Sequence, residues 1–116
     1  MVADQISELE VDRLFHALAD RTRRDIVRHV IDGEHSISDL ARRYPMSMAA
    51  VQKHVAVLEG AGLVTKNRRG REQRVAGRVE AVREAQRLLA LYEQAWLGRF
   101  ERMRDVLSET PQEGTT

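Results

Sequence analysis

The spacing of apolar residues predicts two consecutive helices near the start of the chain. The first covers residues 8–19, because apolar side chains recur there at intervals of three and four, at Val11, Leu14, Phe15 and Leu18. Asp20 precedes a second predicted helix over 21–31, and an aspartate in that position caps the free N–H groups of a helix start. Gly33 is placed to end this second helix.

Two more helices are predicted on either side of Pro45, which breaks the chain between them. Ser38 is expected to cap a short helix over 39–43, and Ser47 a longer one that ends near Gly60. One face of this longer helix is apolar, because helical intervals separate Val51, Val55 and Leu58.

The pattern then changes from helical to alternating. Residues 65–75, "TKNRRGREQRV", predict two strands around a turn at Gly70, since glycine readily takes the positive φ of a tight turn. Apolar positions return at intervals of three and four over 79–107, which predicts one long C-terminal helix. The last residues, 108–116, are expected to form a disordered tail.

This order of elements predicts a mainly α fold with a small β-hairpin. Two helices joined by a tight turn, "RYPM" at 43–46, and followed by a basic hairpin describe a winged helix-turn-helix. The expected organisation is a single domain over 1–107, with its core at about 20–78 and the long helix at about 79–107.

Composition limits the chemistry of the chain. It contains no cysteine, which excludes disulfides and thiolate metal sites. It has no apolar run near the roughly 20 residues of a membrane span, and its N-terminus "MVADQISELE" is too acidic for a signal peptide. We therefore expect a cytoplasmic protein without a membrane partner. The sequence also lacks a Gly-rich phosphate loop and a nucleophile elbow, so we do not expect an enzyme.

Basic residues concentrate between positions 66 and 78. Six Lys and Arg residues against one Glu give this segment a net charge of +5, whereas the whole chain carries only +1. Such a segment indicates contact with a polyanion, and a solvated charged surface is the alternative. Arginines at a hairpin turn are suited to pair with phosphates or to enter a DNA minor groove.

The helix after Ser47 has an outer face suited to a DNA major groove. That face is small and polar, without an acid before Glu59, and comprises Met48, Ala49, Gln52, Lys53 and Ala56. Gln52 can bond adenine bidentately, and Lys53 can donate to guanine or to a phosphate. His54 is expected to pack and to bond a nearby backbone or phosphate oxygen. An ordinary amphipathic helix is the alternative. The candidate DNA-binding residues are Ser47, Met48, Ala49, Gln52, Lys53, His54, Lys66, Arg68, Arg69 and Arg71.

Two stretches resemble the ArsR family of winged helix-turn-helix repressors. "ALADRTRRDIV" at 17–27 is similar to that family's second-helix motif, and "AVQKHVAVLEGAGLV" at 50–64 is similar to its recognition helix and the start of the strand that follows. The resemblance covers about 11–78. It implies a homodimeric bacterial repressor that binds an inverted-repeat operator in double-stranded DNA and dimerises through its first and last helices. The candidate dimer-interface residues are Leu14, Leu89, Tyr92, Trp96, Phe100 and Met103.

The chain departs from the metal-sensing members of that family. Those members use cysteines beside the recognition helix, or histidines and acids on the terminal helix. Here the histidines form no i, i+4 pair and stop at residue 54; they are His16, His29, His35 and His54. We therefore expect no metal and no cofactor, and "YEQAWLGRFERMRDVL" resembles the branch without metal ligands. A metal-responsive repressor and a protein-interaction winged helix stay alternatives, whereas RNA binding lacks its aromatic stacking surfaces.

Overall fold

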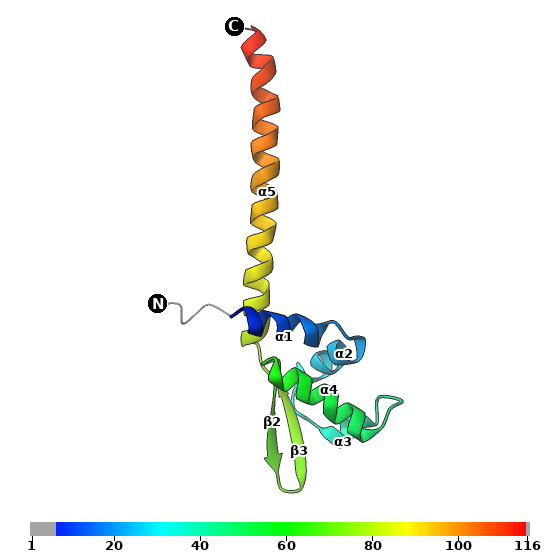
Figure 1. Ribbon diagram of the computed structural model, residues 1–116. Coiled ribbons are helices and arrows are strands. Elements are labelled where there is room, and N and C mark those ends of the chain that lie inside the picture. Colours follow the sequence, from blue (N-terminus) through cyan, green and yellow to red (C-terminus); the bar gives the residue numbers. More distant parts are fainter. Residues whose placement is uncertain (1–6, 116) are drawn as a thin grey trace. The chain divides into compact units, whose positions relative to one another are not determined.

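The computed structural model describes residues 7–115, and the side chains of 7–108 (Figure 1). It is mainly helical, with a small antiparallel sheet, which confirms the predicted fold class. In chain order the elements are α1 (Glu8–Leu18), α2 (Arg21–Val30), β1 (His35–Ser36), α3 (Ile37–Ala41), α4 (Met48–Gly60), β2 (Val64–Arg69), β3 (Glu72–Gly77) and α5 (Glu80–Thr115).

Polar side chains cap the starts of the first four helices. Asp20 Oδ1 accepts a hydrogen bond from Arg23 N at 3.0 Å, and Ser47 Oγ accepts one from Ala50 N at 3.1 Å, so both predicted caps are confirmed. The hydrogen bond from Arg23 N also holds the pKa of the Asp20 carboxyl below its usual value. A capping box of Ser7 and Glu10 starts α1, where each side chain bonds the other residue's backbone N–H.

The cap of the short helix α3 was predicted wrongly. The capping residue is Ser36, whose Oγ accepts a hydrogen bond from Asp39 N at 3.0 Å, and the helix begins at Ile37. Ser38 lies inside the helix and is exposed. The earlier start places Ile37 in the core, where its side chain is only 6% exposed, and this burial decides between two serines that could both act as caps.

The sheet has three antiparallel strands in the order β1-β3-β2. The hairpin of β2 and β3 is confirmed, and Gly70 has a φ of 62° at its turn, as the tight connection requires. The two residues of β1 pair with β3, so that His35 lies opposite Val75. This pairing ties the hairpin to the segment that leads into α3.

One core holds the sheet and the helices together, and α4 packs against α1, α2 and α3 around it. The predicted inward face of α4 is confirmed, because Val51, Val55 and Leu58 are fully buried. Val75 of β3 is buried with them. The other core residues are Leu14, Ala17, Ile26, Val30, Ile37, Leu40, Leu63, Val64 and Ala85.

Contacts divide the chain into two compact units, Met1–Ala85 and Gln86–Thr116. The boundary lies inside α5, because the start of this helix contributes Ala81 and Ala85 to the core of the first unit. The helix runs to Thr115, beyond its predicted end at Leu107 and into the segment expected to be a disordered tail. Within residues 7–115, no helix is long and apolar enough to cross a bilayer.

Candidate nucleic-acid interface

The outer face of α4 presents the side chains that the sequence predicted. Met48, Ala49, Gln52 and Lys53 are all exposed, and the helix carries no acid in its first turn. Ser47 is exposed as well, but its hydroxyl is engaged as the N-cap. The positive end of the helix dipole therefore coincides with an acid-free surface, which favours an anionic or base-edge partner.

The turn that precedes α4 is anchored to α2 by one hydrogen bond. Tyr44 donates its hydroxyl proton to Asp25 Oδ2 at 2.7 Å, and Arg28 bonds the other oxygen of the same carboxylate at 2.6 Å. The bond from Tyr44, more than that from Arg28, lowers the pKa of Asp25. Burial and the same bond raise the pKa of Tyr44. This bond fixes the start of α4 relative to α2.

Within the protein, His54 contacts a side chain and not the backbone oxygen that we expected as one of its two possible partners. Its Nδ1 lies 3.3 Å from Arg23 Nη1, and its ring is half-buried. The rest of the Arg23 guanidinium bonds the carbonyl oxygens of His16 at 2.9 Å and Ala17 at 2.8 Å, at the C-terminal end of α1. His54 therefore joins α4 to Arg23 of α2. Its role in DNA binding stays a prediction.

The register of the hairpin assigns its cations to two faces. Side chains alternate along a strand, and directly paired residues share a face. Val75 is buried against the core, so Gln73 projects from the same face of β3, and Arg71 lies in the turn directly before that strand. Lys66 and Arg68 join this face from β2, because Lys66 pairs with Val75 and Arg68 with Gln73. We call this set of four residues the inner wing face.

The opposite face carries cations that are already bonded to carboxylates. Arg74 Nε donates to Glu34 Oε1 at 3.1 Å, and its Nη1 donates to Glu72 Oε1 at 3.0 Å. The bond to Glu34 chiefly raises the pKa of Arg74. Arg69 Nη2 lies 3.5 Å from Glu34 Oε2. Arg69, a predicted DNA-binding residue, is therefore partly neutralised within the protein.

The four predicted wing cations thus fall into two classes. Lys66 is half-buried, with its Nζ 3.4 Å from Glu59 Oε1. Arg68 and Arg71 are exposed, and neither has a carboxylate partner within the part of the chain that the structure describes. The net charge of +5 therefore overstates the cations that the wing offers to a partner.

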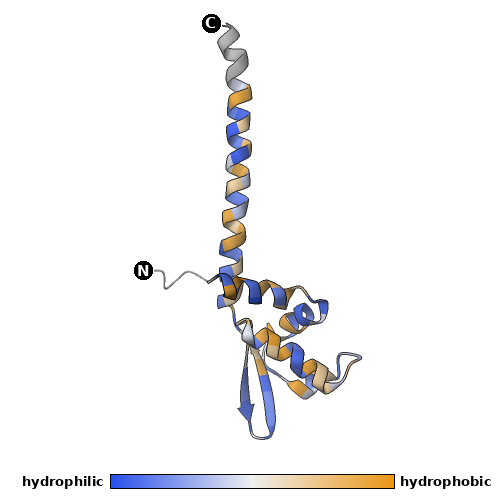
Figure 2. Ribbon diagram, in the orientation of Figure 1, coloured by the Kyte–Doolittle hydropathy of each residue, from blue (hydrophilic) through white to orange (hydrophobic). Residues whose placement is uncertain are grey.

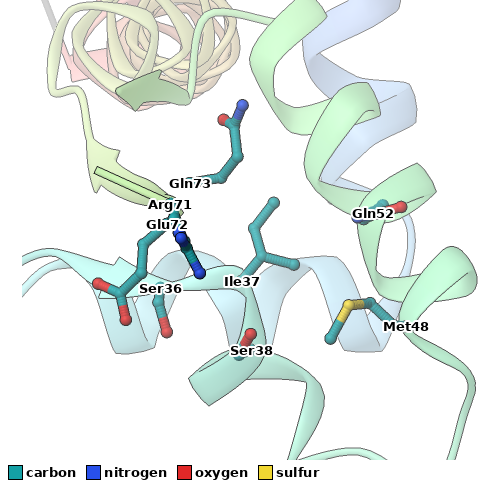
Figure 3. A pocket seen from close by; sticks show the side chains of 8 residues that line it. All are labelled: Ser36, Ile37, Ser38, Met48, Gln52, Arg71, Glu72 and Gln73. Carbon is teal, nitrogen blue, oxygen red and sulfur yellow. The ribbon is translucent and has the colours of Figure 1, made fainter. Parts of the chain in front are cut away.

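A depression of about 180 Å³ is bordered by α4, by the start of β3 and by residues 36–38 of β1 and α3. Figure 3 shows the side chains around it. Its lining consists of Ser36, Ile37, Ser38, Met48, Gln52, Arg71, Glu72 and Gln73. The sequence reasoning missed Gln73 and Ser38. Counting alternate positions back from the apolar Val75 would have placed Gln73 on this face.

The candidate dimer residues differ in exposure. Leu14 is only 1% exposed, because it packs α1 onto the chain's own core, and it has almost no surface left for a second copy. This placement corrects the prediction for that residue. The five candidates on α5 are between 52% and 64% exposed, and Figure 2 shows apolar positions recurring along this helix. They are Leu89, Tyr92, Trp96, Phe100 and Met103.

Residues that could hold a metal ion do not gather in the described part of the chain. Among residues 7–115, no three His, Asp or Glu side chains lie close enough together to form such a site. His29 and Asp25 approach within 3.3 Å, but Arg28 and Tyr44 also bond that carboxylate.

Known proteins resemble this chain in sequence. Residues 18–67 match a family described as a helix-turn-helix domain. The HTH-type transcriptional regulator Rv2034 of Mycobacterium tuberculosis is 47% identical over 53 residues, 46% of this chain and 50% of that protein. The uncharacterized HTH-type transcriptional regulator YuzN of Bacillus subtilis is 40% identical over 67 residues, 52% of this chain and 73% of that protein. The chain thus spans about half the length of Rv2034.

Solved structures agree with the fold. An ArsR-like transcriptional regulator from Rhodococcus sp. RHA1 is 30% identical, with a TM-score of 0.80 over 87% of this chain and 93% of that one. The homodimeric winged helix-turn-helix DNA-binding domain of Mb0332 from Mycobacterium bovis is 27% identical, with a TM-score of 0.57 over 74% of this chain and 77% of that one. The chain belongs to the ArsR family of winged helix-turn-helix transcriptional regulators.

Proposed function

We propose that this protein is a cytoplasmic, sequence-specific repressor that binds double-stranded DNA as a homodimer. In this proposal α4 enters the major groove of the operator, and the hairpin of β2 and β3 contacts the sugar-phosphate backbone. The family membership supports a DNA-binding regulator. Repression, the operator and the dimer are the steps that we add.

One observation carries the proposal. Gln52 from the acid-free face of α4 and Arg71 and Gln73 from the inner wing face line the same depression, with Glu72 beside them. Gln52 and Lys53 supply long donors on the helix, and Arg68 and Arg71 supply cations on the wing that no carboxylate of the described residues neutralises. A helix that reads base edges beside arginines that hold phosphates is the division of labour that specific DNA binding needs.

The exposed apolar residues of α5 support a second copy of the chain as partner. Exposed apolar patches of this kind mark interaction sites, and the related Mb0332 domain is described as homodimeric. Two-fold pairing presents two copies of α4 to two half-sites, so we expect the operator to be an inverted repeat.

The first experiment tests the bases that α4 reads. Genome-wide mapping of bound sites supplies an operator, on which Gln52→Ala and Lys53→Ala are compared with wild type. Removing a specific bond to a base should cost on the order of 1–3 kcal/mol and relax the preference for operator over scrambled DNA. Gln94→Ala, at an exposed position of α5, is the matched control. If both variants keep the wild-type ratio of operator affinity to scrambled-DNA affinity, Gln52 and Lys53 do not read bases.

A protein-interaction module is the alternative function that the same fold could serve. Retention on heparin, and its dependence on salt, separates the two functions, because phosphate contacts release counterions on binding. A DNA-binding protein should elute late and shift strongly with ionic strength. Early elution that salt does not change would favour the protein-interaction module.

A further inference from the structure

The polar side chains that line the depression next to α4 differ in whether the described part of the chain gives them partners. No hydrogen bond or ion pair engages the side chains of Gln52, Arg71 or Gln73 within the described residues. Their neighbours differ, because Ser36 caps α3 and Glu72 bonds Arg74. Figure 3 shows Gln52 on one side of the depression and Gln73 on the other. The side-chain amides of Gln52 and Gln73 therefore both line this depression, and their donors and acceptors can bond a ligand there.

The chemistry of this lining matches an A·T base pair. An amide presents one donor beside one acceptor, as does the major-groove edge of adenine, whereas guanine presents two acceptors there. Thymine adds an acceptor oxygen and a methyl group. The apolar counterpart of that methyl is Met48, which lies one helical turn before Gln52 on the same face and is 46% exposed at the rim.

We propose that Gln73 is a second base reader, which recognises an A·T pair together with Gln52 and Met48. Gln52 bonds adenine, Met48 contacts the thymine methyl, and Gln73 donates from β3 to the thymine oxygen or to the adjoining base edge. This inference rests on the proposed function. It adds to that function a specificity residue that lies on the wing strand and not on the recognition helix.

The first test measures which operator positions depend on Gln73. Each base pair of one half-site is changed in turn to the other three, and affinities are measured for wild type and for Gln73→Ala. At the A·T position that Gln52→Ala relaxes, or at the position beside it, discrimination should fall about fivefold or more. Gln73 is uncharged, so the slope of log affinity against log salt should stay at the wild-type value.

A second variant guards against an effect of folding. Gln73→Met keeps the length of the side chain and removes both hydrogen-bonding groups, so it should relax the same positions as Gln73→Ala. Gln94→Ala should leave every position unchanged. If both Gln73 variants rank all operator variants as wild type does, the inference is overturned.

The second test concerns the thymine methyl. Replacing that thymine by uracil removes only the methyl group, and wild-type affinity should fall about fourfold, the size expected for one buried methyl. Met48→Ala should be weaker on the thymine operator and indifferent to the replacement. Equal sensitivity of wild type and Met48→Ala to uracil would remove Met48 from the site.

The outcomes separate this inference from the proposed function. A wild-type protein without any sequence preference contradicts the proposed function itself. A wild-type protein with a clear operator, whose preference Gln73 variants keep in full, leaves the proposed function standing and overturns only the role of Gln73.

Discussion

Arg23 is a cation that works inside the protein, although it lies in a basic stretch of a DNA-binding fold. Its guanidinium bonds two carbonyl oxygens at the end of α1 and meets His54 of α4, and the neighbouring Arg24 bonds the carbonyl of Leu18 at 2.7 Å. The last carbonyls of a helix lack partners within it. Arg23 therefore joins the end of α1 to α4.

Removing these bonds should measurably destabilise the protein. Arg23→Met keeps the aliphatic part of the side chain and removes the donors, so we expect the free energy of unfolding to fall by about 1–2 kcal/mol. Arg21→Met is the matched control on the same helix, because Arg21 is exposed and bonds no carbonyl or carboxylate within the described residues. Urea denaturation of both variants checks the prediction, and equal decreases in the two variants would contradict it.

The bond between Tyr44 and Asp25 makes stability depend on pH. Tyr44→Phe should lower the free energy of unfolding at pH 7 by on the order of 1–2 kcal/mol, because it removes a bond to a charged group. The pKa of Asp25 is lowered in the folded state from a usual value of 3.8. Its stabilisation is therefore complete above that value and is lost as the pH falls through the lower, folded pKa.

The deficit of Tyr44→Phe should accordingly narrow on acidification below about pH 3.8. Urea denaturation at pH 7 and at pH 3 measures it. Gln94→Ala serves as the control, since Gln94 is exposed on α5 and belongs to no proposed site. A deficit of the same size at both pH values would show that the carboxylate is not the partner that matters.

The hairpin, as an element, separates cations that face a partner from cations bonded within the protein. Replacing Arg68 and Arg71 together by Ala should weaken binding to every DNA sequence. For each phosphate that the variant no longer neutralises, the slope of log affinity against log salt should become shallower by about 0.9. The matched control is the double variant Arg69→Ala, Arg78→Ala, which removes the same charge from residues paired with Glu34 and Glu80.

The two double variants distinguish contact from mere charge. If the inner wing face touches the backbone, the first variant should flatten the salt slope clearly more than the second. Equal slopes in the two double variants would mean that binding depends only on the net charge of the protein. A wild-type slope in the first variant would show that Arg68 and Arg71 touch no phosphate.

Elements of this fold follow from the sequence because their signals are local. The helical intervals of Val51, Val55 and Leu58 and the glycine at the hairpin turn each lie within a few residues of what they determine. The cap of α3 was misplaced because Ser36 and Ser38 both suit that role, and only the burial of Ile37 decides between them.

The functional surface was less predictable because its partners are distant in sequence. Glu34 and Arg74 are 40 residues apart in the sequence. No local spacing of residues indicates that the carboxylate of Glu34 accepts a hydrogen bond from this arginine of the wing. The apolar periodicity of α1 likewise indicates that Leu14 lies on a covered face of the helix. It does not indicate whether the same chain or a second copy covers that face. Packing of α1 against the core decides this, and it buries Leu14 within the chain.

At the scale of the whole molecule, we expect operator binding to be independent of metal ions. The chain has no thiol, and no group of His, Asp or Glu in the described residues forms a metal site. Operator affinity should stay constant with a chelator and with Zn²⁺, Ni²⁺ or arsenite at low micromolar levels. A large, saturable loss of affinity with one of them would favour the metal-responsive alternative instead.

The dimer should depend on the apolar stripe of α5. Leu89 and Trp96 lie on the same face of this helix, seven residues apart, and are 52% and 64% exposed in the isolated chain. Pairing with the same helix of a second copy would bury them. Replacing each by Ala should then cost roughly 2–5 kcal/mol of dimer stability. Leu91→Ala is the matched control, because Leu91 is 58% exposed but lies about 200° around the helix from Leu89.

Sedimentation and operator binding together decide the matter. The double variant Leu89→Ala, Trp96→Ala should sediment as a monomer or an unfolded chain and should lose operator affinity, because one copy of α4 meets only one half-site. Leu91→Ala should remain a dimer with wild-type affinity. A double variant that stays dimeric, or that becomes a folded monomer with undiminished operator affinity, would show that this stripe does not form the interface on which DNA binding depends.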